Sequence, residues 1–181
     1  MSRIPLPAIG DAPAASQPAL AQIQSAFGAT PNMFRAVANS PAALASMWGS
    51  FGALGGGVLP ARLCEQVAVA IADRNRCHYC LAAHTMLGRK AGASAAEMAE
   101  AQAGRSADAR TAAALAFAIK VVERRADIGD GDVAELREAG FGDEAIVELL
   151  AHVALNLFTN YVNVAFDVPL DFPKVTLRQA A

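Results

Sequence analysis

Apolar residues recur along most of this chain at three- and four-residue spacing, the pattern of amphipathic helices, and turn-forming residues divide the pattern into segments. Thr30-Pro31 and Ser40-Pro41 each resemble an N-cap followed by proline in the first helical turn. Ser94 and Asp132 each stand three residues before a glutamate, the spacing of a capping box. The sequence contains no β-rich segment, internal repeat or low-complexity tract. These patterns predict an all-α protein.

The predicted helices cover residues 18–27, 31–38, 41–54, 60–74, 77–90, 94–104, 106–125, 132–140 and 143–166. Residues 1–17 are rich in proline and alanine and are expected to form an extended arm, followed by a single helical domain over 18–181. The tail from residue 168 is also expected to be extended. Residues 67–72 are apolar on every side, so helix 60–74 should be buried, and Glu65 within it must find a partner.

The chemically distinctive stretch runs from residue 65 to 92 and holds Cys77, Cys80 and His84. At positions i, i+3 and i+7 of a helix these side chains share one face. Helix geometry places Cα atoms three residues apart at roughly 5 Å, inside the disulfide range of about 4.4–6.8 Å. The two thiols can therefore form and break a disulfide with little backbone movement. Closing so short a loop removes little entropy from the unfolded state. We therefore do not expect this disulfide to serve mainly to stabilise the fold.

A cysteine attacks as its thiolate, and an ordinary thiol has a pKa near ~8.5. A helix N-terminus stabilises an anion by roughly 0.3–1 kcal/mol, less than the ~1.36 kcal/mol of one pKa unit. This effect favours Cys77, which lies nearest the N-terminus, whereas Cys80 would need His84 as its base. Tyr79 and Glu65 could extend the proton path. The cluster therefore predicts a redox-active or peroxidatic dithiol site.

Other interpretations of these residues stay open. The cysteines and His84 could hold a structural zinc ion with Glu65 as fourth ligand, or the two thiols could simply be core residues. Tyr79 could equally be a packing aromatic. Cys64 is expected to be a buried apolar thiol, and His78 a surface residue off the stripe.

A second polar pattern lies on the apolar last helix. Its members recur at steps of three or four residues: His152, Asn156, Asn160, Asn163 and Asp167. We expect hydrogen bonds within the subunit or between subunits here, in preference to direct catalysis.

The spacing E-x11-C-x2-C-x3-H, formed by Glu65, Cys77, Cys80 and His84, resembles that of the alkylhydroperoxidase D/carboxymuconolactone decarboxylase family. The resemblance extends from about residue 28 to about residue 163 and is strongest to the peroxidase-related branch. One departure is that alkylhydroperoxidase D has histidine immediately before the second cysteine, where this chain has Tyr79.

The resemblance implies a compact multi-helix bundle, with the CxxC at the N-terminal end of a central helix, assembled into trimers or hexamers. It also implies a hydroperoxide-reducing enzyme supplied with electrons by a dithiol donor. Cys80 would attack the peroxide, Cys77 would resolve the intermediate, and Glu65 and His84 would relay protons. We follow this assignment of the attacking sulfur, although the helix N-terminus favours Cys77.

Composition and charge indicate which partners and which cell compartment to expect. The net charge of −2 gives no basic surface for nucleic acid. The sequence has no run of about 18 apolar residues and no signal-peptide core, so neither a membrane protein nor a secreted one is expected. Three cysteines, two of them in CxxC, fit a reducing cytoplasm. A hydrophobic content of 54% allows buried subunit interfaces, so a homo-oligomer is expected.

The peroxide-reducing scheme requires no haem, flavin or metal cofactor. Two other functions stay open. The first is a carboxymuconolactone decarboxylase-like reaction on a lactone acid, although that chemistry needs no dithiol. The second is a non-enzymatic thiol sensor or oligomeric binding protein that uses the same disulfide as a switch.

Overall fold

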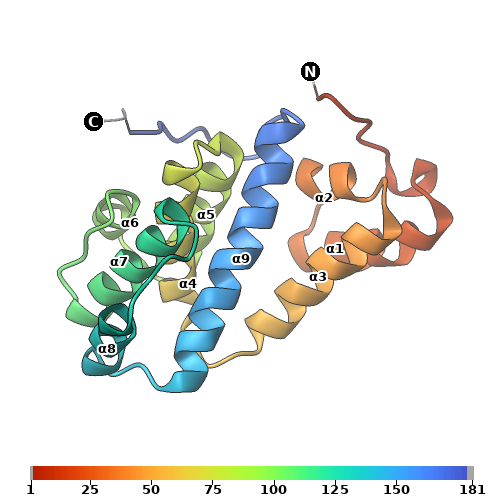
Figure 1. Ribbon diagram of the computed structural model, residues 1–181. Coiled ribbons are helices and arrows are strands. Elements are labelled where there is room, and N and C mark those ends of the chain that lie inside the picture. The colour runs from red at the N-terminus through yellow and green to blue at the C-terminus, as the bar shows by residue number, and fades with distance from the viewer. Residues whose placement is uncertain (1, 179–181) are drawn as a thin grey trace.

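The computed structural model describes residues 2–178, and every regular element among them is a helix (Figure 1). The α-helices are α1 (Gln17–Phe27), α2 (Asn32–Val37), α3 (Pro41–Gly55), α4 (Ala61–Arg74), α5 (His78–Lys90), α6 (Ala95–Gln102), α7 (Ala109–Glu123), α8 (Asp130–Glu138) and α9 (Asp143–Ala165). Two 3₁₀ turns, Ile9–Asp11 and Ala14–Ser16, interrupt the N-terminal arm. The all-α prediction is confirmed. Residue 1 of the predicted arm and residues 179–181 of the tail lie outside the described residues.

Two of the predicted helix starts follow the cap residues read from the sequence. The Ser40 hydroxyl accepts a hydrogen bond from the backbone nitrogen of Ala43, and Pro41 occupies the first turn of α3. At α6, Ser94 and Glu97 form a reciprocal capping box, each side chain accepting from the other residue's backbone N–H. Local hydrogen bonding therefore sets these boundaries.

At α2, α7 and α8 the predicted start differs from the observed one by one to three residues. Pro31 is the N-cap of α2 and not its first residue. Asp108, not Ser106, caps α7, its carboxylate accepting from the backbone nitrogen of Thr111 at 2.8 Å. Asp132 is the third residue of α8, where its carboxylate accepts from the backbone nitrogen of Gly129 at 2.9 Å. Several nearby residues could cap each helix, and the packed arrangement selects among them.

Helix α9 runs through the middle of the molecule, with α1–α3 on one side and α4–α8 on the other (Figure 1). Helix α4 packs against α5, α6, α7 and α9, and each residue from Val67 to Ala72 is buried, as predicted. Burying these side chains against four helices supplies much of the apolar contact that stabilises the fold.

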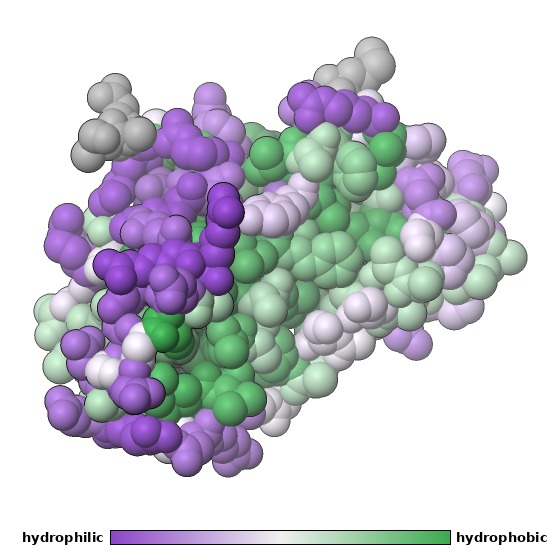
Figure 2. Space-filling model, viewed as in Figure 1, coloured by the Kyte–Doolittle hydropathy of each residue, from purple (hydrophilic) through white to green (hydrophobic). Residues whose placement is uncertain are grey.

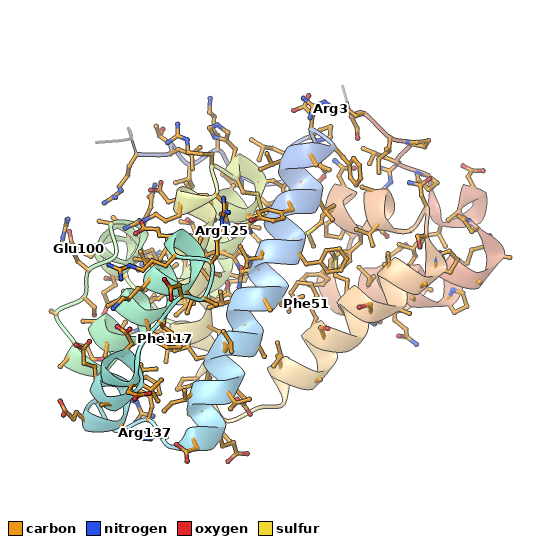
Figure 3. The ribbon with its side chains drawn as sticks, in the orientation of Figure 1. Arg3, Phe51, Glu100, Phe117, Arg125 and Arg137 are labelled. Atoms are coloured by element: carbon orange, nitrogen blue, oxygen red, sulfur yellow. A yellow bond between two sulfur atoms is a disulfide. The ribbon has the colours of Figure 1, made fainter. Side chains whose placement is uncertain are left out.

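Both ends of the chain pack on this bundle. The Arg3 guanidinium donates to the carbonyl oxygens of Val164 and Ala165 at the C-terminus of α9 (Figure 3). Beyond α9 the chain crosses to the α4–α5 side, where the backbone nitrogen of Arg178 donates to Asp73 at 3.0 Å. This path brings the tail over the beginning of α5.

Helix α9 is long and apolar enough to cross a membrane, judged by length and composition alone. In the fold, however, 56% of its most apolar window is buried, which is the behaviour of a core helix. Its outer face carries apolar side chains at steps of three and four residues: Val147, Leu150, Ala154, Leu157, Tyr161 and Val164. We call this set the α9 stripe. Figure 2 shows the hydrophobic band on this face of the molecule.

Candidate active site

The turn between α4 and α5 places the two cysteines. Arg76 adopts a left-handed conformation (φ 56°), and the backbone nitrogen of Cys77 donates to the carbonyl of Ala72 at 2.9 Å. This is the hydrogen bond of a Schellman turn, formed here with arginine at the position that usually holds glycine. It ends α4 and makes Cys77 the N-cap of α5 within three residues.

Cys77 and Cys80 are joined by a disulfide, with their Cα atoms 5.4 Å apart. The Cys77 sulfur accepts a hydrogen bond from the backbone nitrogen of Cys80 at 3.2 Å. Both residues are buried, with exposed fractions of 1% and 2%. The prediction that a CxxC pair at the start of a helix can form a disulfide is therefore confirmed.

Glu65 finds its partner in His84. The Nδ1 atom of His84 lies 2.7 Å from Oε2 of Glu65, and both side chains are partly buried, 14% and 21% exposed. When the carboxylate is ionised, it holds the ring hydrogen on Nδ1, so that Nε2 is the basic nitrogen. The residues predicted to relay protons are thus brought together from α4 and α5.

Tyr79 is engaged by the C-terminal tail. Its hydroxyl donates to Oδ2 of Asp171 at 2.5 Å and accepts from the backbone nitrogen of Met33 at 3.3 Å. Its ring packs edge-on against Phe172, with ring centroids 5.4 Å apart. Burial and then the Asp171 hydrogen bond raise the pKa of Tyr79. A phenol whose pKa is raised is a weaker proton donor, so these contacts fit an anchoring residue. That Tyr79 takes a direct part in proton transfer stays a prediction.

The asparagines of α9 lie inside the subunit. Asn163 Nδ2 donates to the sulfur of Cys80 at 3.3 Å and to the carbonyl of Thr159 at 2.9 Å. Asn160 accepts from Asn75, and Asn156 donates to the carbonyl of His152. The predicted hydrogen bonds within the subunit are present.

The contact between Asn163 and Cys80 was not predicted. The available signal was an amide on the polar stripe of a helix that is otherwise apolar. Three atoms in this row are buried without a hydrogen-bond partner among the described residues: Asn156 Oδ1, Asn160 Nδ2 and Asn163 Oδ1. Buried amide atoms without partners are unusual in proteins and mark places where a small molecule can supply the missing bond.

Cys64 is partly buried, and its sulfur lies 3.5 Å from Nε2 of His152. Burial, reinforced by the neighbouring Glu65, raises the pKa of the Cys64 thiol to about 12. Burial likewise lowers the pKa of His152. Near neutral pH this pair is a protonated thiol beside a neutral imidazole, so Cys64 does not provide a third thiolate.

Two pockets adjoin these groups. A cavity of about 60 Å³, which we call the cysteine cavity, is lined by Cys80, Tyr79 and His84 together with apolar side chains. A larger one of about 170 Å³, the inner cavity, is lined by Glu65, His84, Cys64, His152 and Asn156, again among apolar side chains. Both are bordered by His84, Thr159 and Phe51, the last of which extends from α3 (Figure 3).

Cys77 borders neither of these two pockets. It lines a separate space of about 430 Å³, the Cys77 groove, together with Arg76, the exposed His78, and residues from the end of α9 and the tail. His78 is therefore on the surface, as predicted. Within residues 2–178, no group of three or more histidine, cysteine or acidic side chains is placed to hold a metal ion.

The sequence model of the carboxymuconolactone decarboxylase family matches residues 31–124, and the chain belongs to this family. The match includes Glu65, both cysteines of the CxxC pair and His84 but ends before α9. No curated protein sequence matches the chain.

Solved structures share the whole fold. An uncharacterised peroxidase-related protein from Silicibacter sp. TM1040 is 26% identical, with a TM-score of 0.80 over 93% of this chain and 91% of that one. A protein from Ralstonia eutropha JMP134, described as an alkylhydroperoxidase AhpD core and peroxidase-related, is 25% identical, with a TM-score of 0.82 over 94% and 92%. The debrominase Bmp8, in complex with 2,3,4-tribromopyrrole, is 21% identical, with a TM-score of 0.79 over 94% of each chain, a similarity of fold alone.

These similarities identify an AhpD-like protein of the peroxidase-related branch, with the fold expected from the sequence resemblance. The family is one of enzymes in general.

Proposed function

We propose that the chain is a cytoplasmic, thiol-dependent hydroperoxide reductase in which Cys80 attacks the peroxide. The observation that carries the proposal is that Cys80 and His84 border the same cavity, while Glu65 orients His84 from the other side. A small peroxide in the cysteine cavity can meet the sulfur and the imidazole together. The disulfide between Cys80 and Cys77 is the product that such a reaction leaves.

Access distinguishes the two sulfurs where the number of hydrogen-bond donors does not. Each would be stabilised as a thiolate by one N–H donor, Cys77 by the backbone of Cys80 and Cys80 by the Asn163 amide. Only Cys80 lines a cavity that also holds His84. This supports the family-based assignment of Cys80 as the attacking sulfur.

The reaction then follows from the chemistry of cysteine. The Cys80 thiolate attacks the terminal oxygen of the hydroperoxide, the O–O bond breaks, and the departing alkoxide takes a proton from the His84–Glu65 pair. Cys80 becomes a sulfenic acid. The Cys77 thiol attacks that sulfur, releasing water and forming the disulfide. A dithiol donor must then supply two electrons and two protons to restore both thiols.

The apolar α9 stripe supports the further proposal that the chain assembles as a homo-oligomer. Val147 and Tyr161 are 67% and 60% exposed, unusually high values for large side chains on an apolar helix face. Alternating steps of three and four residues are typical of a seam between packed helices. A second copy of the chain is the proposed occupant, and the family resemblance points to trimers or hexamers.

The test of the proposed function is turnover. Purified protein is given a panel of organic hydroperoxides and hydrogen peroxide with excess dithiothreitol, and peroxide loss is followed for the wild type and for Cys80→Ser. We expect many turnovers per chain from the wild type and almost none from Cys80→Ser. A single stoichiometric oxidation without turnover, under conditions in which the disulfide is reduced again, would indicate a sensor and not an enzyme.

A further inference from the structure

The disulfide separates two spaces that have different chemistry. Cys80 lines the cysteine cavity, and Cys77 lines the Cys77 groove. Among residues 2–178, Tyr79 alone borders both. A molecule in the groove therefore lies beside Cys77 without entering the space proposed for the peroxide.

The groove has the size and lining of a small-molecule site. Its volume of about 430 Å³ falls within the range of roughly 300–1,000 Å³ that is typical of ligand sites. Val164 and Leu170 give it apolar walls, and both are well exposed, at 45% and 39%.

The charges around the groove are mainly positive. Arg76 and Lys174 line it with His78, and Asp167 is the one acidic side chain among the lining residues that the structure describes. The Arg76 guanidinium is held in place by a hydrogen bond to the carbonyl of Arg178 at 2.6 Å. A ligand with a negative group is therefore favoured over a neutral or cationic one.

One of the residues that line the groove is a buried amide in contact with the disulfide. Asn163 lines the groove but is only 4% exposed. Its Nδ2 is used by Cys80 and Thr159, whereas its Oδ1 has no hydrogen-bond partner among the described residues. The Asn163 side chain therefore joins the lining of the groove to the Cys80 sulfur.

We propose that the Cys77 groove binds the electron donor, a small dithiol that carries a carboxylate or similar anionic group, and that its first thiolate attacks Cys77. The proposal rests on the peroxide-reductase function and specifies the class of reductant and the sulfur at which reduction begins. Peroxide and reductant would then reach the same disulfide from different spaces.

The exchange balances in two steps. The first reductant thiolate forms a bond to the Cys77 sulfur, the Cys77–Cys80 bond breaks, and Cys80 departs as a thiolate beside the Asn163 amide. The second reductant thiolate attacks the reductant's own sulfur in the mixed disulfide, and Cys77 departs as a thiolate that accepts from the Cys80 backbone N–H. The reductant becomes a cyclic disulfide after losing two electrons and two protons, which the two cysteines gain.

The first experiment tests the charge preference on the reduction step alone. Oxidised protein is mixed without oxygen with 3-mercaptopropionate, 2-mercaptoethanol or cysteamine, which are similar in size and carry a negative, no or a positive charge. The first-step rate is measured by rapid acid quench, alkylation and mass spectrometry. Taking the ratio of Lys174→Glu to wild type for each thiol removes differences in intrinsic thiol reactivity.

Reversing one charge at the groove should lower the 3-mercaptopropionate rate about three- to tenfold at low salt and raise the cysteamine rate by a similar factor. The 2-mercaptoethanol rate should change less than about twofold, because that thiol has no charge for Lys174 to attract. The control is Lys90→Glu, an equal charge change at an exposed lysine outside the groove. For this variant the ratio to the wild-type rate should be the same for all three thiols. Equal ratios for the three thiols in Lys174→Glu would overturn the charge preference.

The second experiment locates the attacked sulfur in the wild-type protein. Trypsin cleavage after Arg76 and Arg89 gives one peptide with both cysteines, and fragmentation between them shows which one carries the thiol adduct. We expect the adduct on Cys77 and the alkyl group on Cys80; the reverse pattern would overturn the proposal.

The two proposals fail differently. If reduced protein does not react with peroxide, the peroxide-reductase function fails, whatever the thiol experiments show. If the protein turns over peroxide but the thiol adduct forms on Cys80, only the assignment of the groove fails. The oligomeric state of Lys174→Glu is compared with that of the wild type, because Val164 belongs to both the groove and the α9 stripe.

Discussion

Removing the Asn163 amide is predicted to slow peroxide attack by weakening the Cys80 thiolate. In Asn163→Ala the donor that lies 3.3 Å from the Cys80 sulfur is lost. Both residues are buried, 4% and 2% exposed. A hydrogen bond to a charged group contributes about 1.5–3 kcal/mol, which corresponds to roughly ten- to a hundredfold in thiolate population near neutral pH.

The assay is stopped-flow oxidation of the reduced protein by peroxide between pH 6 and 9. We expect Asn163→Ala to be about ten- to a hundredfold slower than the wild type near pH 7, with much of the rate recovered at the alkaline end, where the thiol ionises without the donor. A hydrogen-bond donor to the thiolate favours the charged form of Cys80, so losing that donor moves the ionisation of Cys80 to higher pH.

The matched control is Asn160→Ala. It removes the same buried side chain one turn earlier on α9, where the amide contacts Asn75 and not Cys80. Both truncations should cost a similar amount of stability, about 1–3 kcal/mol. If Asn163→Ala keeps the wild-type rate, or if its loss persists unchanged at pH 9, Asn163 does not stabilise the attacking thiolate.

Four further outcomes are expected. Cys77→Ser should oxidise once and stop at a sulfenic acid on Cys80 that dimedone traps. If Cys80→Ser instead forms a trapped sulfenic acid on Cys77 at a near-native rate, the assignment of Cys80 as the attacking sulfur is reversed. Glu65→Gln should slow peroxide attack about tenfold, since a charged hydrogen bond is replaced by a neutral one that is weaker by about 1.4 kcal/mol; unchanged single-turnover kinetics would argue against the relay. Light scattering should give an oligomer that Tyr161→Glu dissociates or weakens, and a wild-type monomer at micromolar concentration would contradict the proposed assembly. The Cys64 thiol, with a pKa raised to about 12, should resist iodoacetamide at pH 8 in the folded, reduced protein, and rapid labelling would contradict its burial beside His152.

The sequence determined the helical class, most helix positions and the redox pair. Apolar periodicity and cap residues are local signals, so they locate α3 and α6 without knowledge of the fold. The CxxC disulfide is likewise local, because the spacing of Cys77 and Cys80 within one helical turn fixes their separation. Where several nearby residues could cap a helix, as around Asp108, local signals did not select the right one.

Only the tertiary structure decided which distant residues meet at the site. Periodicity placed Asn163 on a polar stripe, but its contact with Cys80 depends on how α9 packs beside α5. The Tyr79 hydroxyl is hydrogen-bonded because the C-terminal tail packs over the beginning of α5 and places Asp171 beside it. The separation of the Cys77 groove from the cysteine cavity has the same origin. It follows from the relative placement of helices and tail, which long-range packing determines and no local sequence pattern encodes.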